Sequence, residues 1–192
     1  MRLLLVLLFA GLPALAQAPV VLRLTLVHFA GGAWQENEIA ELAARAVTIL
    51  GQCAIAPGKL ELMRVDVEPR FRYFHTPTSR ELARKLQPRA PTVYFVDGTR
   101  QRPAFDAEAI GRGNSRSRPE LADSVWIVRD ARDPELALAH ELVHVLMDSG
   151  EHSEESGNLM RDETAPGNTK MSEAQCARLR ANGLANGLLS PP

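Results

Sequence analysis

The chain of 192 residues lacks several features that would place it in a specialised class. Its formal net charge is only -1, so the composition gives no electrostatic reason to expect binding to nucleic acid or to an anionic membrane. Beyond the N-terminus, no apolar run approaches the roughly 20 residues that span a bilayer. Internal repeats, low-complexity segments and linker-like stretches are also missing. What remains, with 45% hydrophobic and 23% charged residues, is typical of one globular domain.

The first residues have the composition of an export signal rather than of a folded segment. Arg2 precedes an apolar run from Leu3 to Leu12, and Ala14-Leu15-Ala16 provides the small residues that signal peptidase prefers. The sequence therefore predicts a signal peptide over residues 1–16 and a single mature domain over 17–192. This domain would be periplasmic or secreted, with no membrane attachment after cleavage. An uncleaved membrane anchor is the alternative, but it needs a longer apolar span.

Cysteine is scarce, with Cys53 and Cys176 as the two such residues. In an exported protein an even pair favours a structural disulfide bond, and two buried free thiols are the alternative. Neither cysteine is close in sequence to the histidine-rich stretch described below, which argues against a zinc-thiolate site.

Hydrophobic periodicity predicts an α+β order of elements. The predicted strands cover residues 20–29, 59–67, 91–96 and 122–128, and the arginine-rich stretch over 99–120 leaves room for one short strand. The predicted helices cover 34–50, 79–86, 134–149 and 172–181, with Ser79, Asp133 and Ser172 as N-caps and Gly51 and Gly150 as C-terminal stops. This order predicts a mixed twisted sheet packed on the helix over 134–149, followed by a C-terminal helix.

Histidine is rare but clustered: of five in the chain, His140, His144 and His152 lie within thirteen residues. The first two belong to the run His140-Glu141-Leu142-Val143-His144, an HExxH unit inside a predicted helix. Residues at i and i+4 share one helix face, so both imidazoles can reach one metal ion. Glu141 is placed to act on a metal-bound water rather than to coordinate the ion. The pattern is typical of zinc hydrolases.

The run HELVH, followed by Gly150, His152 and Gly157-Asn158-Leu159-Met160, resembles the metzincin clan of zinc metallopeptidases. Their pattern is HExxHxxGxxH followed by a tight turn that bears Met, and the order of predicted elements is similar as well. The spacing departs from the family. Met147 stands where the family has Gly, and Gly150 stands where it has the third histidine.

The resemblance implies a zincin-like fold and an exported, zinc-dependent endopeptidase that acts on a peptide or protein substrate. The Zn²⁺ ligands would be His140, His144 and His152. Glu141 would be the general base for a zinc-bound water, and Met160 would form an apolar floor beneath the metal. With the lengthened spacer, the chain would have to turn back at Gly150 to bring His152 to the metal.

Two alternatives follow from that spacer. In a zincin of another subclass a carboxylate would replace His152, and the candidates are Asp148, Glu151, Glu155 and Glu163. The second alternative is a non-catalytic zincin-fold binding protein, against which the retained Glu141 argues.

The remaining histidines and the arginine-rich loop are interpreted as structural. His28 ends a strand and His75 lies in an aromatic loop. Arg112, Arg116 and Arg118 are expected in a solvated loop, although they could border the cleft and favour acidic substrates. The sequence indicates neither cleavage specificity nor oligomeric state.

Overall fold

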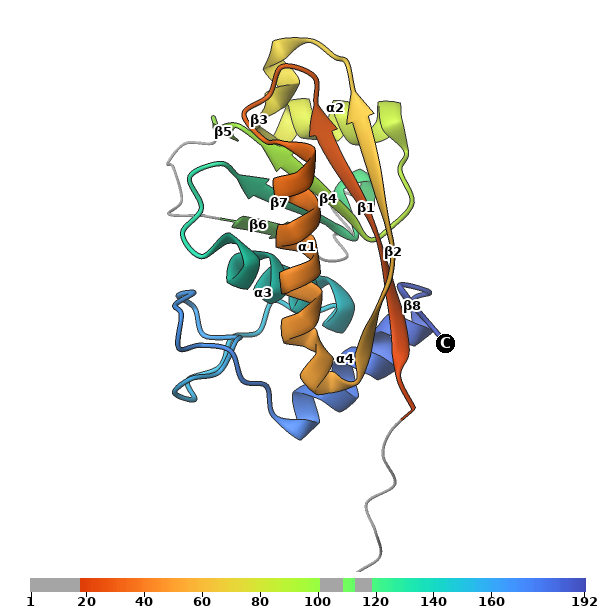
Figure 1. Cartoon of the computed structure of the whole chain (residues 1–192), viewed down its shortest axis with the longest axis vertical. Coiled ribbons are helices and arrows are strands. Elements are labelled where there is room, and N and C mark those ends of the chain that lie inside the picture. Colours follow the sequence, from red (N-terminus) through yellow and green to blue (C-terminus); the bar gives the residue numbers. More distant parts are fainter. Residues whose placement is uncertain (1–17, 101–108, 113–118) are drawn as a thin grey trace, which may run out of the picture.

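The structure is a computed structural model that describes residues 18–100, 109–112 and 119–192 (Figure 1). The predicted signal peptide over 1–16 lies outside the described residues, as do Arg116 and Arg118. Arg112 lies on a strand whose side chains are likewise outside the description.

A mixed six-stranded sheet forms the centre of the molecule, with its main strands in the order β2-β1-β4-β7-β6. The parallel strands are β2 (Ile55–Val65), β1 (Val20–Phe29), β4 (Thr92–Val96) and β7 (Ser124–Val128). At one edge, β6 (Ala109–Arg112) runs antiparallel to β7. The short β8 (Leu189–Ser190) pairs antiparallel with the beginning of β1. A separate two-stranded sheet joins β3 (Tyr73–Phe74) to β5 (Gly98–Thr99).

Helices cover both faces of this sheet. On one face lie α1 (Glu36–Leu50) and α3 (Pro134–Met147), with α4 (Glu173–Ala185) packed against α3, and on the other lies α2 (Thr76–Leu86) (Figure 1). Short 3₁₀ helices cover Gly51–Cys53, Pro69–Arg72 and Pro119–Leu121. Strands β4 and β7 are buried at every residue, as expected for parallel strands covered on both faces. Alternate residues serve two cores: Phe95 and Ile127 face α1 and α3, while Tyr94 and Trp126 face α2.

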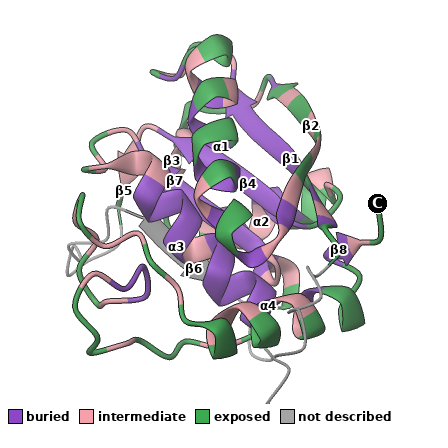
Figure 2. Cartoon of the chain, turned by 60° about the horizontal axis from the view of Figure 1, so that its bottom comes forward, coloured by how far each residue is buried: buried purple, intermediate pink, exposed green. Residues whose placement is uncertain are grey.

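The helix that bears the HExxH unit is almost entirely buried. In α3 every residue from Leu136 to Met147 is buried except Glu141 (Figure 2). A helix that is hydrophobic on all sides belongs in the interior of a domain, and α3 lies between α1, α4 and the strands β6 and β7. The two histidines of the motif therefore stand in an apolar layer.

Several predicted boundaries are wrong by a few residues. Helix α2 begins at Thr76 rather than Ser79, because Pro77 is well suited to the first turn of a helix. Strand β2 begins at Ile55 rather than Lys59, and its register with β1 shifts around Gly58. A Cβ atom at that glycine would lie 2.6 Å from Val21 Cγ1, so the close approach of the two strands requires glycine.

The helix ends show a similar pattern. Ser172 caps α4 through a complete capping box, as predicted, but α4 runs to Ala185 instead of 181. Asp133 occupies the N-cap of α3, yet its side chain makes no capping hydrogen bond. After α1 the left-handed residue is Ala54 (φ 53°) rather than Gly51, since the 3₁₀ turn Gly51–Cys53 extends the helix first.

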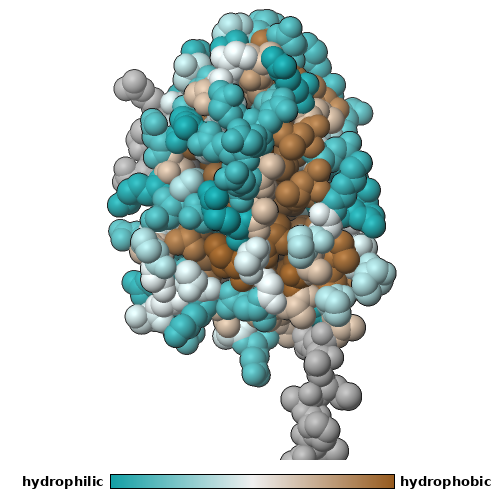
Figure 3. All heavy atoms as spheres, viewed as in Figure 1, coloured by the Kyte–Doolittle hydropathy of each residue, from teal (hydrophilic) through white to brown (hydrophobic). Residues whose placement is uncertain are grey.

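The outer edge strand β2 carries charge among its hydrophobic residues. On the face shown in Figure 3, hydrophobic residues reach the surface between α1 and β2. Among the described residues, the large hydrophobic side chains that are exposed are Leu62 on β2 and Leu184 on α4. Exposed charged residues on β2, such as Lys59, Glu61 and Arg64, discourage pairing of this free edge with another chain.

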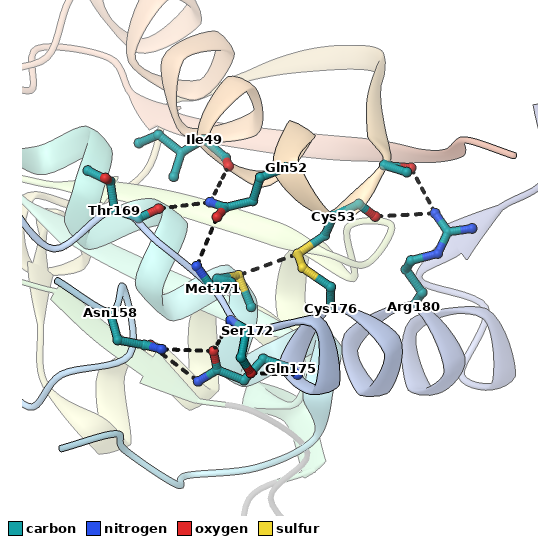
Figure 4. The surroundings of a disulfide bond; sticks show 11 residues. Ile49, Gln52, Cys53, Asn158, Thr169, Met171, Ser172, Gln175, Cys176 and Arg180 are labelled. Carbon is teal, nitrogen blue, oxygen red and sulfur yellow. Dashed lines mark hydrogen bonds between the residues drawn. A yellow bond between two sulfur atoms is a disulfide. The ribbon is translucent and has the colours of Figure 1, made fainter. Parts of the chain in front are cut away.

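Cys53 and Cys176 form a disulfide bond, with Cα atoms 4.9 Å apart across 123 residues of sequence. The bond joins the 3₁₀ turn after α1 to the first turn of α4 (Figure 4). Within the described residues, no helix is long and apolar enough to cross a membrane.

Candidate metal centre

The fold brings the three predicted histidines together. His140 and His144 project from α3, and His152 comes from the loop that follows it. The Nε2 atom of His144 lies 3.0 Å from that of His140 and 3.2 Å from that of His152. In the described part of the chain, these three residues form a group whose ring nitrogens could hold a metal ion, all lying within 4.8 Å of one another.

Backbone carbonyl groups orient the two helical histidines. The Nδ1 atom of His140 is 2.8 Å from the Leu159 carbonyl oxygen, and that of His144 is 2.7 Å from the Ser149 carbonyl oxygen. A carbonyl oxygen can only accept a hydrogen bond, so each Nδ1 must carry the proton. In the neutral rings both Nε2 atoms then present lone pairs, as metal-binding histidines do.

The donor set fits a small cation. Two unprotonated Nε2 atoms 3.0 Å apart cannot hydrogen-bond to each other, so their approach is favourable when a positive charge lies between them. A tetrahedral zinc ion with Zn–N bonds of about 2.0–2.1 Å would place its nitrogen ligands about 3.3 Å apart. The separations of 3.0 and 3.2 Å are close to that value. The third ring, His152, has its Nδ1 atom 3.4 Å from Asp162 Oδ1.

Burial keeps the helical histidines uncharged near neutral pH. The relative exposure is 4% for His140 and 9% for His144. Burial lowers the pKa of His140, and burial together with the neighbouring His140 lowers the pKa of His144 to about 4. A metal ligand must be deprotonated, so both rings are ready to bind metal at pH 7.

The long spacer to His152 is accommodated by an early turn. Helix α3 ends at Met147, and Asp148 takes the left-handed conformation (φ 48°) that turns the chain. The prediction that the helix runs to Ser149 and turns at Gly150 is therefore wrong. The Ser149 amide donates to the His144 carbonyl, and its own carbonyl faces the His144 ring. Because the helix ends at Met147 and the chain turns at Asp148, the residues from Ser149 onward are long enough to bring His152 back to the two other histidines.

The predicted Met-containing turn is present and buried. Asn158, Leu159 and Met160 are at most 2% exposed, and the Asn158 side chain accepts a hydrogen bond from the Met160 amide at 2.9 Å. Gly157 begins the turn in the left-handed region (φ 77°). The Met160 carbonyl accepts a hydrogen bond from the amide of Ser153, the residue after His152. Met160 packs in the same core cluster as α3, and its role as a floor beneath a metal stays a prediction.

The carboxylates considered as replacements for His152 do not belong to the three-histidine group. Glu151 forms an ion pair with Arg178 on α4, which lowers the pKa of its carboxyl group. Glu155 accepts a hydrogen bond from the side chain of Asn158 at 3.3 Å. Asp148 and Glu163 are likewise outside the group.

Glu141 follows His140 on α3 and is the partly exposed residue in an otherwise buried run. His28 and His75 lie elsewhere. His28 is buried at the end of β1, with Nε2 3.4 Å from Glu36 Oε1, and burial lowers its pKa. His75 precedes α2 at its N-cap position.

The sequence missed the supporting residues around the histidines. The sequence cannot show that the carbonyl oxygens of Leu159 and Ser149 orient the histidines, because every residue supplies a backbone carbonyl. Asn158 does carry a signal in the sequence, because an asparagine side chain often accepts a hydrogen bond from a backbone amide two residues on in a turn, as it does here from Met160.

No family model matches this sequence, and no curated protein sequence matches it significantly. Among solved structures, metalloproteinase-II from Bacteroides fragilis is similar with a TM-score of 0.61 and 20% identity, over 88% of this chain and 55% of that one. The archaemetzincin from Methanopyrus kandleri is similar with a TM-score of 0.56 and 12% identity, over 84% of this chain and 94% of that one. This chain thus spans about half of the Bacteroides protein. At such identities the likeness concerns the fold, and it confirms the predicted zincin-like architecture: the chain has the fold of these metallopeptidases.

Proposed function

We propose that the protein is an exported zinc-dependent endopeptidase. The observation that carries the proposal is the convergence of three histidine Nε2 atoms, two of which must bear lone pairs because their Nδ1 atoms donate to carbonyl oxygens. The fold shared with a metalloproteinase and an archaemetzincin supports the same class of enzyme.

In this proposal His140, His144 and His152 hold the metal. Three neutral imidazoles leave the fourth position of a tetrahedral zinc ion open, which is the arrangement found in catalytic rather than structural zinc sites. When bound, zinc supplies Lewis acidity that lowers the pKa of a water to about 7 and polarises a carbonyl group. The all-histidine donor set suits zinc better than magnesium or calcium, which prefer oxygen ligands.

Glu141 acts as the general base. It stands beside His140 on the same helix and is the partly exposed carboxylate in the buried run of α3. Its carboxylate takes a proton from the attacking water and passes that proton to the leaving amine. The two helical histidines stay neutral and fixed by their Nδ1 bonds during this transfer.

The substrate class proposed is a peptide or an unfolded protein, on the strength of the metallopeptidase fold. Export is supported by the disulfide bond, since such bonds persist in oxidising compartments such as the periplasm. The mature domain over 17–192 would form a single catalytic unit.

The deciding experiment is cleavage of casein by the purified zinc-loaded mature protein, with Glu141→Gln as the variant. We expect chelation to abolish cleavage, added zinc to restore it, and Glu141→Gln to lower it by at least about 100-fold, in the range for loss of a general base. The variant should retain zinc and the wild-type circular dichroism spectrum. Equal cleavage by the variant would refute the hydrolase role, whereas zinc binding without any cleavage by the wild type would favour the non-catalytic binding protein.

A further inference from the structure

One face of α4 contacts three separate segments that frame the metal centre. Gln175, Arg178 and Asn182 stand at i, i+3 and i+7, a spacing that places them on one side of a helix. Each side chain bonds to a different part of the site. The disulfide residue Cys176 and Arg180, four positions apart, lie on another side and face the turn after α1 (Figure 4).

Gln175 contacts Asn158, the residue before Leu159. Its Oε1 atom accepts from Asn158 Nδ2 at 3.0 Å, and its Nε2 atom donates to Asn158 Oδ1 at 3.2 Å. Asn158 is 2% exposed, and the same Oδ1 atom accepts from the Met160 amide at 2.9 Å. This paired amide contact fixes the residues on both sides of Leu159, whose carbonyl oxygen receives the His140 Nδ1 proton.

The other two contacts support the helix and loop that carry the remaining histidines. Asn182 Nδ2 donates to the Met147 carbonyl at 2.7 Å, at the point where α3 ends. Arg178 forms an ion pair with Glu151, the residue before His152, and the arginine side chain is 42% exposed. Because surface ion pairs contribute little energy, the partly buried amide contact of Gln175 is a stronger support than the ion pair of Arg178.

The first turn of α4 and the residues just before it are anchored to the 3₁₀ turn after α1. Besides the disulfide bond, Gln52 donates to the Thr169 carbonyl and accepts from the Met171 amide, both at 2.8 Å (Figure 4). The Leu159 amide donates to the Lys170 carbonyl at 2.7 Å, which ties the Met-containing turn to this anchored segment. The start of α4 and the Leu159 turn therefore form one connected unit.

We propose that Gln175 is a positioning residue for the metal centre: through Asn158 it holds the Leu159 carbonyl where it fixes the tautomer and orientation of His140. The inference rests on the proposed function, because it assumes that His140 is a metal ligand. Supporting residues of this kind change metal affinity about 10- to 100-fold when they are removed.

The test measures the zinc dissociation constant of the mature protein by competition with a chromophoric chelator, and the visible spectrum after cobalt substitution. Gln175→Ala should weaken zinc binding about 10- to 100-fold and alter the cobalt bands. Gln175→Glu keeps the capping-box acceptor for the Ser172 amide and an acceptor for Asn158 Nδ2, so it should recover part of the lost affinity.

Arg180→Ala is the matched control. Arg180 lies on the same helix and donates to the backbone carbonyls of Cys53, Ala54 and Ala18, but to no residue of the metal centre. Its removal should lower the thermal unfolding temperature while changing zinc affinity less than about threefold, below the effect expected for a supporting residue.

Two results would overturn the inference alone: wild-type zinc affinity in Gln175→Ala, or an equal loss of affinity in Arg180→Ala. A wild-type protein that binds neither zinc nor cobalt would instead refute the proposed function, and this inference with it.

Discussion

The Nδ1 atom of His140 lies 2.8 Å from the carbonyl oxygen of Leu159, nineteen residues further along the chain. This bond joins the buried helix α3 to the Met-containing turn, and it determines which nitrogen of His140 is free. The candidate metal centre is therefore assembled from two segments that meet only in the folded chain. Their relationship leads to predictions about the third histidine, the effect of pH, the disulfide bond and the glycines of the loop.

His152→Ala should weaken zinc binding by more than the 100-fold upper range for a supporting residue, because it removes a proposed direct ligand. His152 is the exposed member of the group and supplies the Nε2 atom 3.2 Å from His144. The measurement is zinc content after dialysis together with a chelator competition titration. His75→Ala, an exposed histidine outside the group, is the control and should retain zinc. Retention of zinc by His152→Ala would favour the alternative in which a nearby carboxylate is the third zinc ligand.

The metal-free protein should lose stability as the pH falls from 6.5 to about 4. His144 titrates near 4 in the folded chain, and its ordinary pKa is 6.5, so between these values the unfolded chain binds more protons. The stabilisation is fully present above pH 6.5 and amounts to about 3 kcal/mol for this residue. His140 and His28, whose pKa values burial also lowers, change stability in the same direction.

Urea unfolding of the metal-free protein at several pH values between 4 and 7 checks this expectation. His144→Gln should flatten the dependence, since the side chain no longer titrates. A free energy of unfolding that stays constant or rises as the pH falls would contradict the buried, neutral state of these rings.

Replacing both cysteines by serine should lower the free energy of unfolding by about 3 to 5 kcal/mol. The bond closes a loop of 123 residues, and the cost of closing so long a loop in the unfolded chain is about 5 kcal/mol in the chain-entropy model, with smaller values common in practice. Chemical unfolding of the double variant Cys53→Ser/Cys176→Ser measures the loss. A change below about 1 kcal/mol would indicate that the start of α4 is held mainly by the hydrogen bonds of Gln52.

Gly150→Ala should leave stability within about 0.5 kcal/mol of wild type or raise it slightly, because an added Cβ meets nothing within 4 Å and the backbone there is not left-handed. Gly157→Ala should destabilise the protein by about 1 to 2 kcal/mol, because φ is +77° at that residue. Thermal unfolding of the two variants side by side tests the assignment of a left-handed backbone to Gly157 and not to Gly150. A larger loss in Gly150→Ala than in Gly157→Ala would reverse that assignment.

The pattern of single elements was predictable to within a few residues. Strand β1 follows from the alternation over residues 20–29, and the buried helix α3 from its continuous apolar sequence after Asp133 and Pro134. The errors at Ser79, Gly51 and Gly150 have a common cause. Capping and stop signals identify residues able to end a helix, but hydrogen bonds and packing decide which of the neighbouring residues does so.

The sequence by itself determined the pairing of His140 with His144 and placed Glu141, the proposed base, next to His140, because an i, i+4 spacing on a helix has fixed geometry. Tertiary structure alone decided whether His152 reaches them, which carbonyl oxygens orient the rings, and how α4 supports the turn at Leu159. Those relationships depend on the path of a loop and on backbone groups common to every residue. The contacts of α4 with α3, together with the disulfide bond that holds the start of α4 against the turn after α1, help to select one path for that loop.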